Sequence, residues 1–223
     1  MTDSYADTRS RLETYFDQTA AKTWERLTSD APVSRIRATV RAGRDKMRER
    51  LLAALPDDLT GARVLDAGCG AGPMSCALAD RGAQVLGVDI SPSLLEVAKA
   101  RTPQHLAPLV SYQSGDMVDL SRGRFDFVVA MDSLIHYRPA DAAKALTQLS
   151  SVTDDKIVFT IAPKTPLLTI MHVSGKLFPR SDRSPAIVPT SVAALQSELG
   201  KDLRNLGRVN TAFYKSQAME LPA

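Results

Sequence analysis

The chain has little of several things that identify particular classes of protein. Aromatic residues make up 5% of its 223 residues, and Lys plus Arg exceeds Asp plus Glu by only 28 to 25. Neither value favours a nucleic-acid-binding protein, because such proteins combine stacking aromatics with a strongly basic surface. No run of about 18 apolar residues occurs, so no membrane-spanning helix is expected. The amino terminus is polar and acidic rather than signal-like, which predicts a cytoplasmic protein.

Cysteine and histidine are also scarce. Cys69 and Cys76 are too few for a disulfide framework, which favours reduced thiols. His105, His136 and His172 are not spaced as metal ligands, and no His/Cys cluster occurs, so no protein-bound metal is predicted. There is no internal repeat. The length and a hydrophobic content of 44% predict one domain with a full core and some extra elements.

What the chain does have is a glycine-rich turn, Asp66-Ala67-Gly68-Cys69-Gly70-Ala71-Gly72, between an apolar run and a helix-like segment. Glycine has no Cβ, so the backbone there can adopt positive φ and approach a ligand beside the positive end of the next helix. Pro73 breaks the dinucleotide fingerprint, and the lysine and hydroxyl of a P-loop are missing. The remaining D-x-G-x-G-x-G pattern resembles motif I of the Rossmann-like S-adenosylmethionine methyltransferases, although an ordinary glycine-rich turn is the alternative.

The rest of the chain predicts an α/β fold. Two amphipathic helices are expected before residue 55, from about 3 to 27 and after Pro32. Short apolar runs then alternate with helices, which is typical of a parallel sheet covered on both faces. The predicted strands are 63–67, 84–89, 109–113, 125–131, 156–162, 203–209 and 213–219, with helices near 73–81, 92–101, 139–150 and 191–199. We therefore expect the Rossmann-like class I methyltransferase fold, with a seven-stranded, mostly parallel sheet.

Two segments lie outside that minimal fold. Residues 1–55 are expected to form an amino-terminal helical cap on the substrate side of an S-adenosylmethionine-binding domain of residues 56–223. Residues 163–188 form an insertion after the fifth strand, interpreted as a substrate-binding lid, against a plain core helix as the alternative. The second helix carries many basic residues, which form either a solvated face or a surface for carboxylates or anionic lipid.

Acidic residues after the second and third strands complete a cofactor site. Asp89 can accept hydrogen bonds from both ribose hydroxyls of an adenosyl group; the alternative is a helix cap, for which Ser91 is better placed. Asp116 can accept from the adenine amino group, while Met117 donates its backbone N–H and packs on the ring. Together these signals predict S-adenosylmethionine as cosubstrate. The predicted cofactor-binding residues are Asp66, Gly68, Cys69, Gly70, Gly72, Asp89, Ile90, Asp116, Met117 and Met131.

The fourth strand ends in the segment Asp132-Ser133-Leu134-Ile135-His136-Tyr137, at the sheet edge where the methyl acceptor must arrive. His136 is the histidine that the strand assignment places there. Its alternative role is structural, with the ring hydrogen-bonded to backbone. The predicted catalytic residues are His136, Asp132 and Tyr137.

Over nearly its whole length the chain resembles the magnesium-protoporphyrin IX methyltransferase family of chlorophyll and bacteriochlorophyll synthesis. The matching pieces are Tyr15-Phe16, Trp24-Glu25-Arg26, residues 64–70 and 132–137, and most diagnostically Ala162-Pro163-Lys164-Thr165, Leu177-Phe178-Pro179 and Phe213-Tyr214. Family members often carry a tyrosine soon after the tryptophan segment. This chain has Thr28 there, so no role of that tyrosine is transferred.

The resemblance implies transfer of the sulfonium methyl group to one propionate of Mg-protoporphyrin IX, giving the monomethyl ester and S-adenosylhomocysteine. Magnesium enters only as part of the porphyrin. His136 would orient the propionate or ligate the magnesium, aromatic residues would contact the macrocycle, and Arg35 or Arg37 would hold the second propionate. The predicted substrate-binding residues are Tyr15, Phe16, Trp24, Arg35, Arg37 and Lys164.

The family also implies handover from magnesium chelatase and peripheral contact of a cytoplasmic enzyme with the photosynthetic membrane. A methyltransferase acting on another small acid or a quinone-like acceptor is an alternative that the cofactor motifs leave open. A non-catalytic S-adenosylmethionine-binding module is another, and a nucleic-acid-binding module is disfavoured by the composition.

Overall fold

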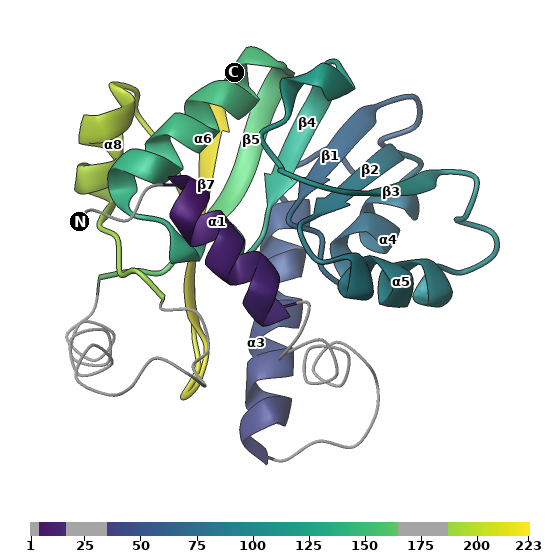
Figure 1. Cartoon of the computed structure of the whole chain (residues 1–223), viewed down its shortest axis with the longest axis horizontal. Coiled ribbons are helices and arrows are strands. Elements are labelled where there is room, and N and C mark those ends of the chain that lie inside the picture. The colour runs from purple at the N-terminus through teal and green to yellow at the C-terminus, as the bar shows by residue number, and fades with distance from the viewer. Residues whose placement is uncertain (1–4, 17–34, 165–186) are drawn as a thin grey trace.

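Seven strands form one sheet in the order β3-β2-β1-β4-β5-β7-β6 (Figure 1). The structure is a computed structural model that describes residues 5–16, 35–164 and 187–223. The five parallel strands are β1 (Arg63–Ala67), β2 (Gln84–Asp89), β3 (Val110–Ser114), β4 (Phe125–Ala130) and β5 (Thr153–Ile161). β7 (Lys215–Pro222) pairs antiparallel with both β5 and β6 (Arg204–Asn210). The predicted seven-stranded, mostly parallel sheet is confirmed.

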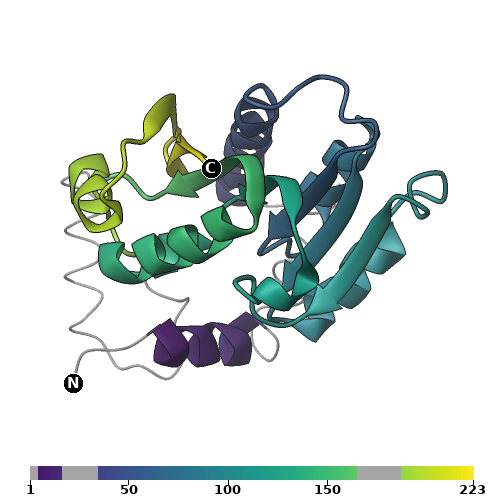
Figure 2. The ribbon, with the colours of Figure 1, turned by 90° about the horizontal axis from the view of Figure 1, so that it is seen from above.

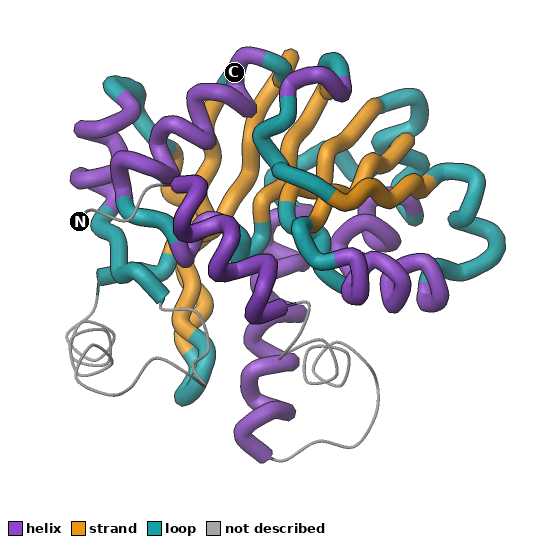
Figure 3. The backbone as a smooth tube through the Cα atoms, viewed as in Figure 1, coloured by secondary structure: helices purple, strands orange, loops and turns teal. Residues whose placement is uncertain are grey.

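The sheet is covered on both faces, because side chains alternate along its strands. Val64, Val129 and Val158 pack with α3 (Arg35–Leu52) and α4 (Pro73–Ala79). Leu65, Val128 and Ile157 face the other way and pack with α6 (Pro139–Ser151), beside which lies α8 (Val192–Leu199). Figure 2 shows these layers from above, and Figure 3 shows the strands side by side between the helices. α5 (Pro92–Arg101) packs on β3 and β2.

Two helices from the amino-terminal region reach the carboxyl ends of the parallel strands. α1 (Tyr5–Thr14) buries Leu12 against the same side of the sheet as α6 (Figure 2). α3 packs on β6 and β7 through Met47 and Leu51, which are fully buried. The proposed division into a cap of residues 1–55 and a domain of residues 56–223 places both helices in the cap. Most of the predicted 163–188 insertion, and residues 17–27 of the predicted first helix, lie outside the described residues.

The turn between β6 and β7 differs from the prediction of a strand over 213–219. Thr211 donates its N–H to the Tyr214 carbonyl at 2.8 Å, and its side-chain oxygen accepts from the Tyr214 N–H at 3.1 Å. These bonds close a tight turn before β7 begins at Lys215. Tyr214 is therefore outside the strand ladder and its ring projects toward the carboxyl ends of the parallel strands.

Within the described residues, no helix is both long enough and apolar enough to cross a bilayer.

Candidate active site

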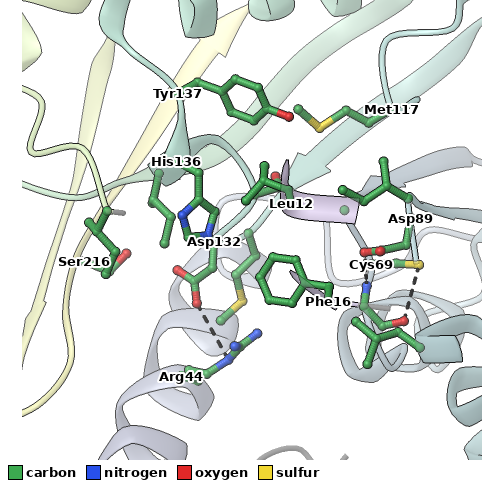
Figure 4. A pocket seen from close by; sticks show the side chains of 18 of the residues that line it. Leu12, Phe16, Arg44, Cys69, Asp89, Met117, Asp132, His136, Tyr137 and Ser216 are labelled. Carbon is green, nitrogen blue, oxygen red and sulfur yellow. Dashed lines mark hydrogen bonds and ion pairs between the residues drawn. The ribbon is translucent and has the colours of Figure 1, made fainter. Parts of the chain in front are cut away.

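A cavity of about 550 Å³ lies at the carboxyl ends of the parallel strands, where open α/β sheets bind ligands (Figure 4). This volume falls in the range of about 300–1,000 Å³ that is usual for small-molecule sites. Its wall is built from the glycine turn, the ends of β2 and β4, the segment 131–137, α1, α3 and the β6–β7 turn. Segments far apart in the sequence are thus brought to one site.

The glycine turn touches the predicted acceptor segment directly. Gly68 has φ of +83°, and a Cβ atom placed there would lie 2.4 Å from Cβ of Ser133. The N–H groups of Gly68 and Cys69 both donate to the Val88 carbonyl, at 2.8 and 3.1 Å. Only glycine gives both the left-handed backbone and this close approach. The glycine turn and the predicted acceptor segment therefore share one wall of the cavity.

Asp89 ends β2 on the same wall. Its carboxylate accepts from the N–H of Gly70 at 2.8 Å and from the N–H of Ser91 at 2.9 Å. Burial raises the pKa of Asp89, and these backbone hydrogen bonds oppose the rise. Ser91 is the residue that caps α5, since its hydroxyl accepts from the Leu94 N–H at 3.3 Å. Asp89 is consequently not needed as the helix cap.

Asp116 joins the cofactor side of the cavity to α1. Its carboxylate accepts from the Tyr5 hydroxyl at 2.7 Å and from Arg9 Nη1 at 2.9 Å. The Tyr5 ring stacks on Tyr137, with centroids 4.8 Å apart. Burial, with smaller contributions from Tyr137 and Asp116, raises the pKa of Tyr5, so this phenol stays protonated and can donate. The predicted adenine contact of Asp116 would share a carboxylate that already receives two donors from α1.

Asp132 begins the acceptor segment in an unusual conformation. It is the described residue other than glycine with positive φ, at +57°, a region that costs energy for a side chain with Cβ. Its N–H donates to Thr160 Oγ1 at 2.7 Å, and its carboxylate accepts from the Tyr214 hydroxyl at 3.0 and 3.1 Å. Arg44 Nε lies 3.7 Å from Oδ2. These contacts fix Asp132, which was predicted to be catalytic, at the start of the acceptor segment.

His136 and Tyr137 point into different parts of the cavity (Figure 4). His136 ends the short 3-10 helix Leu134–His136, and its ring centroid lies 6.1 Å from that of Phe16. Tyr137 is buried, and its ring lies toward Met117 and α1.

Burial raises the pKa of Cys69, so this residue offers the cavity a neutral thiol and backbone.

The structure brings most of the predicted site residues together. The cavity is lined by Phe16, Gly68, Cys69, Gly70, Asp89, Ile90, Asp116, Met117, Met131, Asp132, His136 and Tyr137. The residues that do not line it are Asp66, Gly72, Tyr15, Arg37 and Lys164. Asp66 lies buried behind the glycine turn and accepts from Ser75 Oγ at 2.6 Å. Trp24 and the side chain of Arg35 lie outside the described residues.

Several lining residues were not among the sequence predictions, namely Tyr5, Arg9, Leu12, Arg44, Ser133, Ile187, Phe213 and Tyr214. Phe213 and Tyr214 could have been identified from the sequence, because they form one of the segments that resemble the family. The predicted strand over 213–219 placed them in the sheet instead. Among the described residues, no group of three or more His, Cys, Asp or Glu side chains is arranged to hold a metal ion.

Comparison with known proteins identifies relatives of the whole chain. Residues 64–156 match the family described as Methyltransferase domain, and residues 130–222 match Magnesium-protoporphyrin IX methyltransferase C-terminus. The chain is 52% identical to magnesium-protoporphyrin O-methyltransferase of Rhodobacter capsulatus over 99% of both chains. It is 31% identical to the Synechocystis enzyme of the same name over 99% of this chain and 98% of that one.

Solved structures give the same result. The crystal structure of magnesium protoporphyrin IX methyltransferase from Synechocystis PCC 6803 with bound S-adenosylhomocysteine superposes with a TM-score of 0.80 at 30% identity, covering 96% of this chain and 98% of that one. The same enzyme with bound S-adenosylmethionine gives a TM-score of 0.77. The class I methyltransferase fold is confirmed. From its identity to relatives over the full length, the chain belongs to the magnesium-protoporphyrin O-methyltransferase family.

Proposed function

We propose that this protein transfers the methyl group of S-adenosylmethionine to a propionate carboxylate of Mg-protoporphyrin IX, giving the monomethyl ester and S-adenosylhomocysteine. The observation that carries the proposal is the 52% identity over 99% of both chains to a magnesium-protoporphyrin O-methyltransferase. The shared cavity of the glycine turn and the His136 segment supports it. Magnesium belongs to the substrate in this reaction.

The glycine turn and Asp89 are suited to the cofactor. Asp89 is fixed by two backbone N–H groups, so its carboxylate is already oriented to accept the ribose hydroxyls. Met117 is buried in the wall beside Asp116 and offers an apolar surface for the adenine ring. Positive φ at Gly68 turns the backbone toward the methionine portion of the cofactor.

Catalysis then depends on placement. Bound S-adenosylmethionine supplies an electrophilic methyl carbon; the propionate oxygen forms the new C–O bond to it, and the sulfur leaves with the electron pair as a neutral thioether. A propionate with pKa of about 4.3 is ionised at neutral pH, so the protein has no proton to remove. Holding the oxygen in line is worth up to about 7–11 kcal/mol. His136, on the segment next to the glycine turn, is positioned to orient that carboxylate.

The rim of the cavity is suited to a flat macrocycle. Phe213 is 57% exposed and Ile187 41% exposed, and both line the cavity with Phe16. Exposed apolar groups at a cavity mouth mark a binding surface for an apolar ligand. Tyr15 packs edge-on against Phe16, with centroids 5.3 Å apart, so it supports the ring that lines the cavity. We assign Phe16, Ile187 and Phe213 to the macrocycle.

A quinone-like acceptor is the competing possibility, since ubiquinone biosynthesis O-methyltransferases are 28% identical over 86% of this chain. The higher identity to the porphyrin enzymes and the match over residues 130–222, which include the acceptor segment, favour the porphyrin.

The proposal is tested by incubating the purified protein with S-adenosylmethionine and Mg-protoporphyrin IX, then separating the products by liquid chromatography. We expect monomethyl ester and S-adenosylhomocysteine in equal amounts. A catechol acceptor serves as the comparison substrate. Absence of ester, while S-adenosylmethionine still binds, would contradict the proposal.

We further propose peripheral contact with an anionic membrane, from which the apolar porphyrin is delivered, with direct handover from magnesium chelatase as the family implies. A concave surface formed by α3, β5, β6 and β7 carries more cations than anions. It includes Lys46, Arg50, Lys156, Arg204 and Arg208, against Glu49 and Glu220. Such clusters attract anionic lipid headgroups within a Debye length.

The protein is accordingly expected to co-sediment with phosphatidylglycerol vesicles at low salt and to be released at about 0.5 M salt, because screening shortens the Debye length to a few ångströms. Lys46→Glu combined with Arg208→Glu should lower binding severalfold. Arg124→Glu, on a surface outside this concavity, is the control. Equal binding to neutral phosphatidylcholine vesicles would contradict electrostatic attachment.

A further inference from the structure

One cation inside the cavity lies next to the acceptor segment. Arg44 projects from α3, lines the cavity, and has a side chain that is 18% exposed (Figure 4). Its Nε lies 3.7 Å from Oδ2 of Asp132, beyond hydrogen-bond distance. A guanidinium this close to the segment that carries His136 is placed to meet an anionic part of the acceptor.

Asp132 orients Arg44 by charge and is itself held by other donors. Both of its carboxylate oxygens accept from the Tyr214 hydroxyl, and Oδ1 also accepts from Thr160 Oγ1 at 3.3 Å. The long separation from Arg44 is not the bidentate geometry that guanidinium and carboxylate form when they pair fully. Asp132 thus holds the guanidinium at the cavity wall by charge.

A glycine on α3 fixes the third member of this group. A Cβ atom at Gly43 would lie 2.7 Å from Cδ1 of Tyr214, so the Tyr214 ring packs directly on the helix backbone beside Arg44. Tyr214 is partly buried, and this burial raises the pKa of its hydroxyl, which therefore remains a donor to Asp132. The position of Arg44 is built from three separate elements: α3, the start of the acceptor segment and the β6–β7 turn.

Other cations of the described cavity wall are less well placed. Arg9 donates to Asp116 on the cofactor side, and Lys215 donates to Asn210 and to the Thr211 carbonyl. Arg37, which the sequence suggested for the second propionate, does not line the cavity.

We propose that Arg44 binds the propionate that is not methylated, and that this limits transfer to one carboxylate. The inference rests on the proposed porphyrin substrate. The two propionates are chemically alike, so intrinsic reactivity does not distinguish them and selection has to come from position. With one carboxylate paired to Arg44, the other reaches the methyl group beside His136. A second transfer would require the monoester to bind in reverse, with its uncharged ester group against Arg44.

Arg44→Gln should raise KM for Mg-protoporphyrin IX about 10- to 100-fold, as expected when a charge-assisted hydrogen bond is lost. It should also yield both monoester isomers and, on long incubation, diester. Chromatography with mass detection separates these products. Arg44→Lys keeps the charge but not the fork, and should retain more selectivity than Arg44→Gln. Arg48→Gln is the matched control on the same helix, since Arg48 pairs with Asp45 and does not line the cavity.

The proposal is overturned if Arg44→Gln forms the same single isomer with unchanged KM, or if the wild-type protein methylates its own monoester as fast as the diacid. The second measurement needs no variant, so it decides the question even when Arg44→Gln does not fold. Should the wild-type protein form no ester at all, the proposed function fails. Fluorescence titration of wild-type and Arg44→Gln proteins with the diacid and its dimethyl ester still tests carboxylate recognition separately.

Discussion

Replacing His136 by alanine is expected to lower kcat for ester formation about 100-fold while leaving S-adenosylmethionine affinity within about twofold. The ring lies on the acceptor segment beside Phe16, whereas the proposed cofactor contacts come from the glycine turn and Asp89. A small misplacement of the attacking oxygen costs about this factor, because the rate depends on a near-attack geometry. Steady-state kinetics and calorimetric titration with the cofactor measure the two effects separately.

His105→Ala provides the matched control, since His105 is 73% exposed near Asp80 and outside the cavity wall. It should leave both quantities unchanged. A kcat for His136→Ala equal to that of the wild type would remove His136 from the mechanism. The absorption spectrum of the bound Mg-porphyrin separates the two roles considered for His136, because loss of an axial nitrogen ligand changes the spectrum and loss of an orienting hydrogen bond does not.

Asp66 is expected to make the protein less stable as the pH rises from about 4 to about 7. Burial, opposed by the Ser75 hydroxyl and assisted by the charge of Asp89, raises the pKa of Asp66 to about 7. Its unfolded-state value is near 3.9. Between about pH 4 and pH 7 the Asp66 carboxyl loses its proton in the unfolded chain and keeps it in the folded chain. The free energy of unfolding therefore falls by up to roughly 4 kcal/mol over this range and is constant at higher pH.

The measurement is the difference in free energy of unfolding between Asp66→Asn and the wild type, from urea titrations at about pH 4, 5.5, 7 and 8. Asn can still accept from Ser75 but does not ionise, so the difference should shift in favour of the variant up to about pH 7. Asp58→Asn should show the opposite sign, because hydrogen bonds from Thr60 lower the pKa of exposed Asp58. If the difference in free energy of unfolding between Asp66→Asn and the wild type is independent of pH, folding does not raise the pKa of Asp66.

The sequence predicted those parts of the fold whose signals are local. β1 and β2 have the predicted bounds, because each is a continuous apolar run that ends in an acidic residue or a glycine turn. The β6–β7 turn was missed because Phe213 and Tyr214 have strand-like side chains, whereas the conformation is set by the Thr211 hydroxyl. The meeting of the glycine turn, Asp89 and the His136 segment at one cavity was likewise predictable, since each lies at or directly after the end of a parallel strand.

The rest of the site depends on contacts between distant segments. Tyr5 and Asp116 are 111 positions apart, and nothing near either residue indicates the other. Arg44 was hidden among the many basic residues of α3, yet a signal was present. Val40, Arg44, Met47 and Leu51 follow one another at spacings of four, three and four. Arg44 therefore shares a face of the helix with Met47 and Leu51, which are buried. A cation within an apolar stripe predicts a group directed to the interior.

The position of β7 between β5 and β6 has a consequence for biosynthesis. β6 leaves the ribosome before β7, yet its partner in the sheet is β7. A hairpin of β6 and β7 forms from local contacts, whereas docking on β5 closes a loop of more than fifty residues, which is slower. Tyr214 lies in the turn of that hairpin, and its hydroxyl donates to Asp132. The acceptor side of the cavity is therefore completed only when the hairpin docks on β5. During synthesis the nascent chain thus acquires its glycine turn well before it can hold a porphyrin.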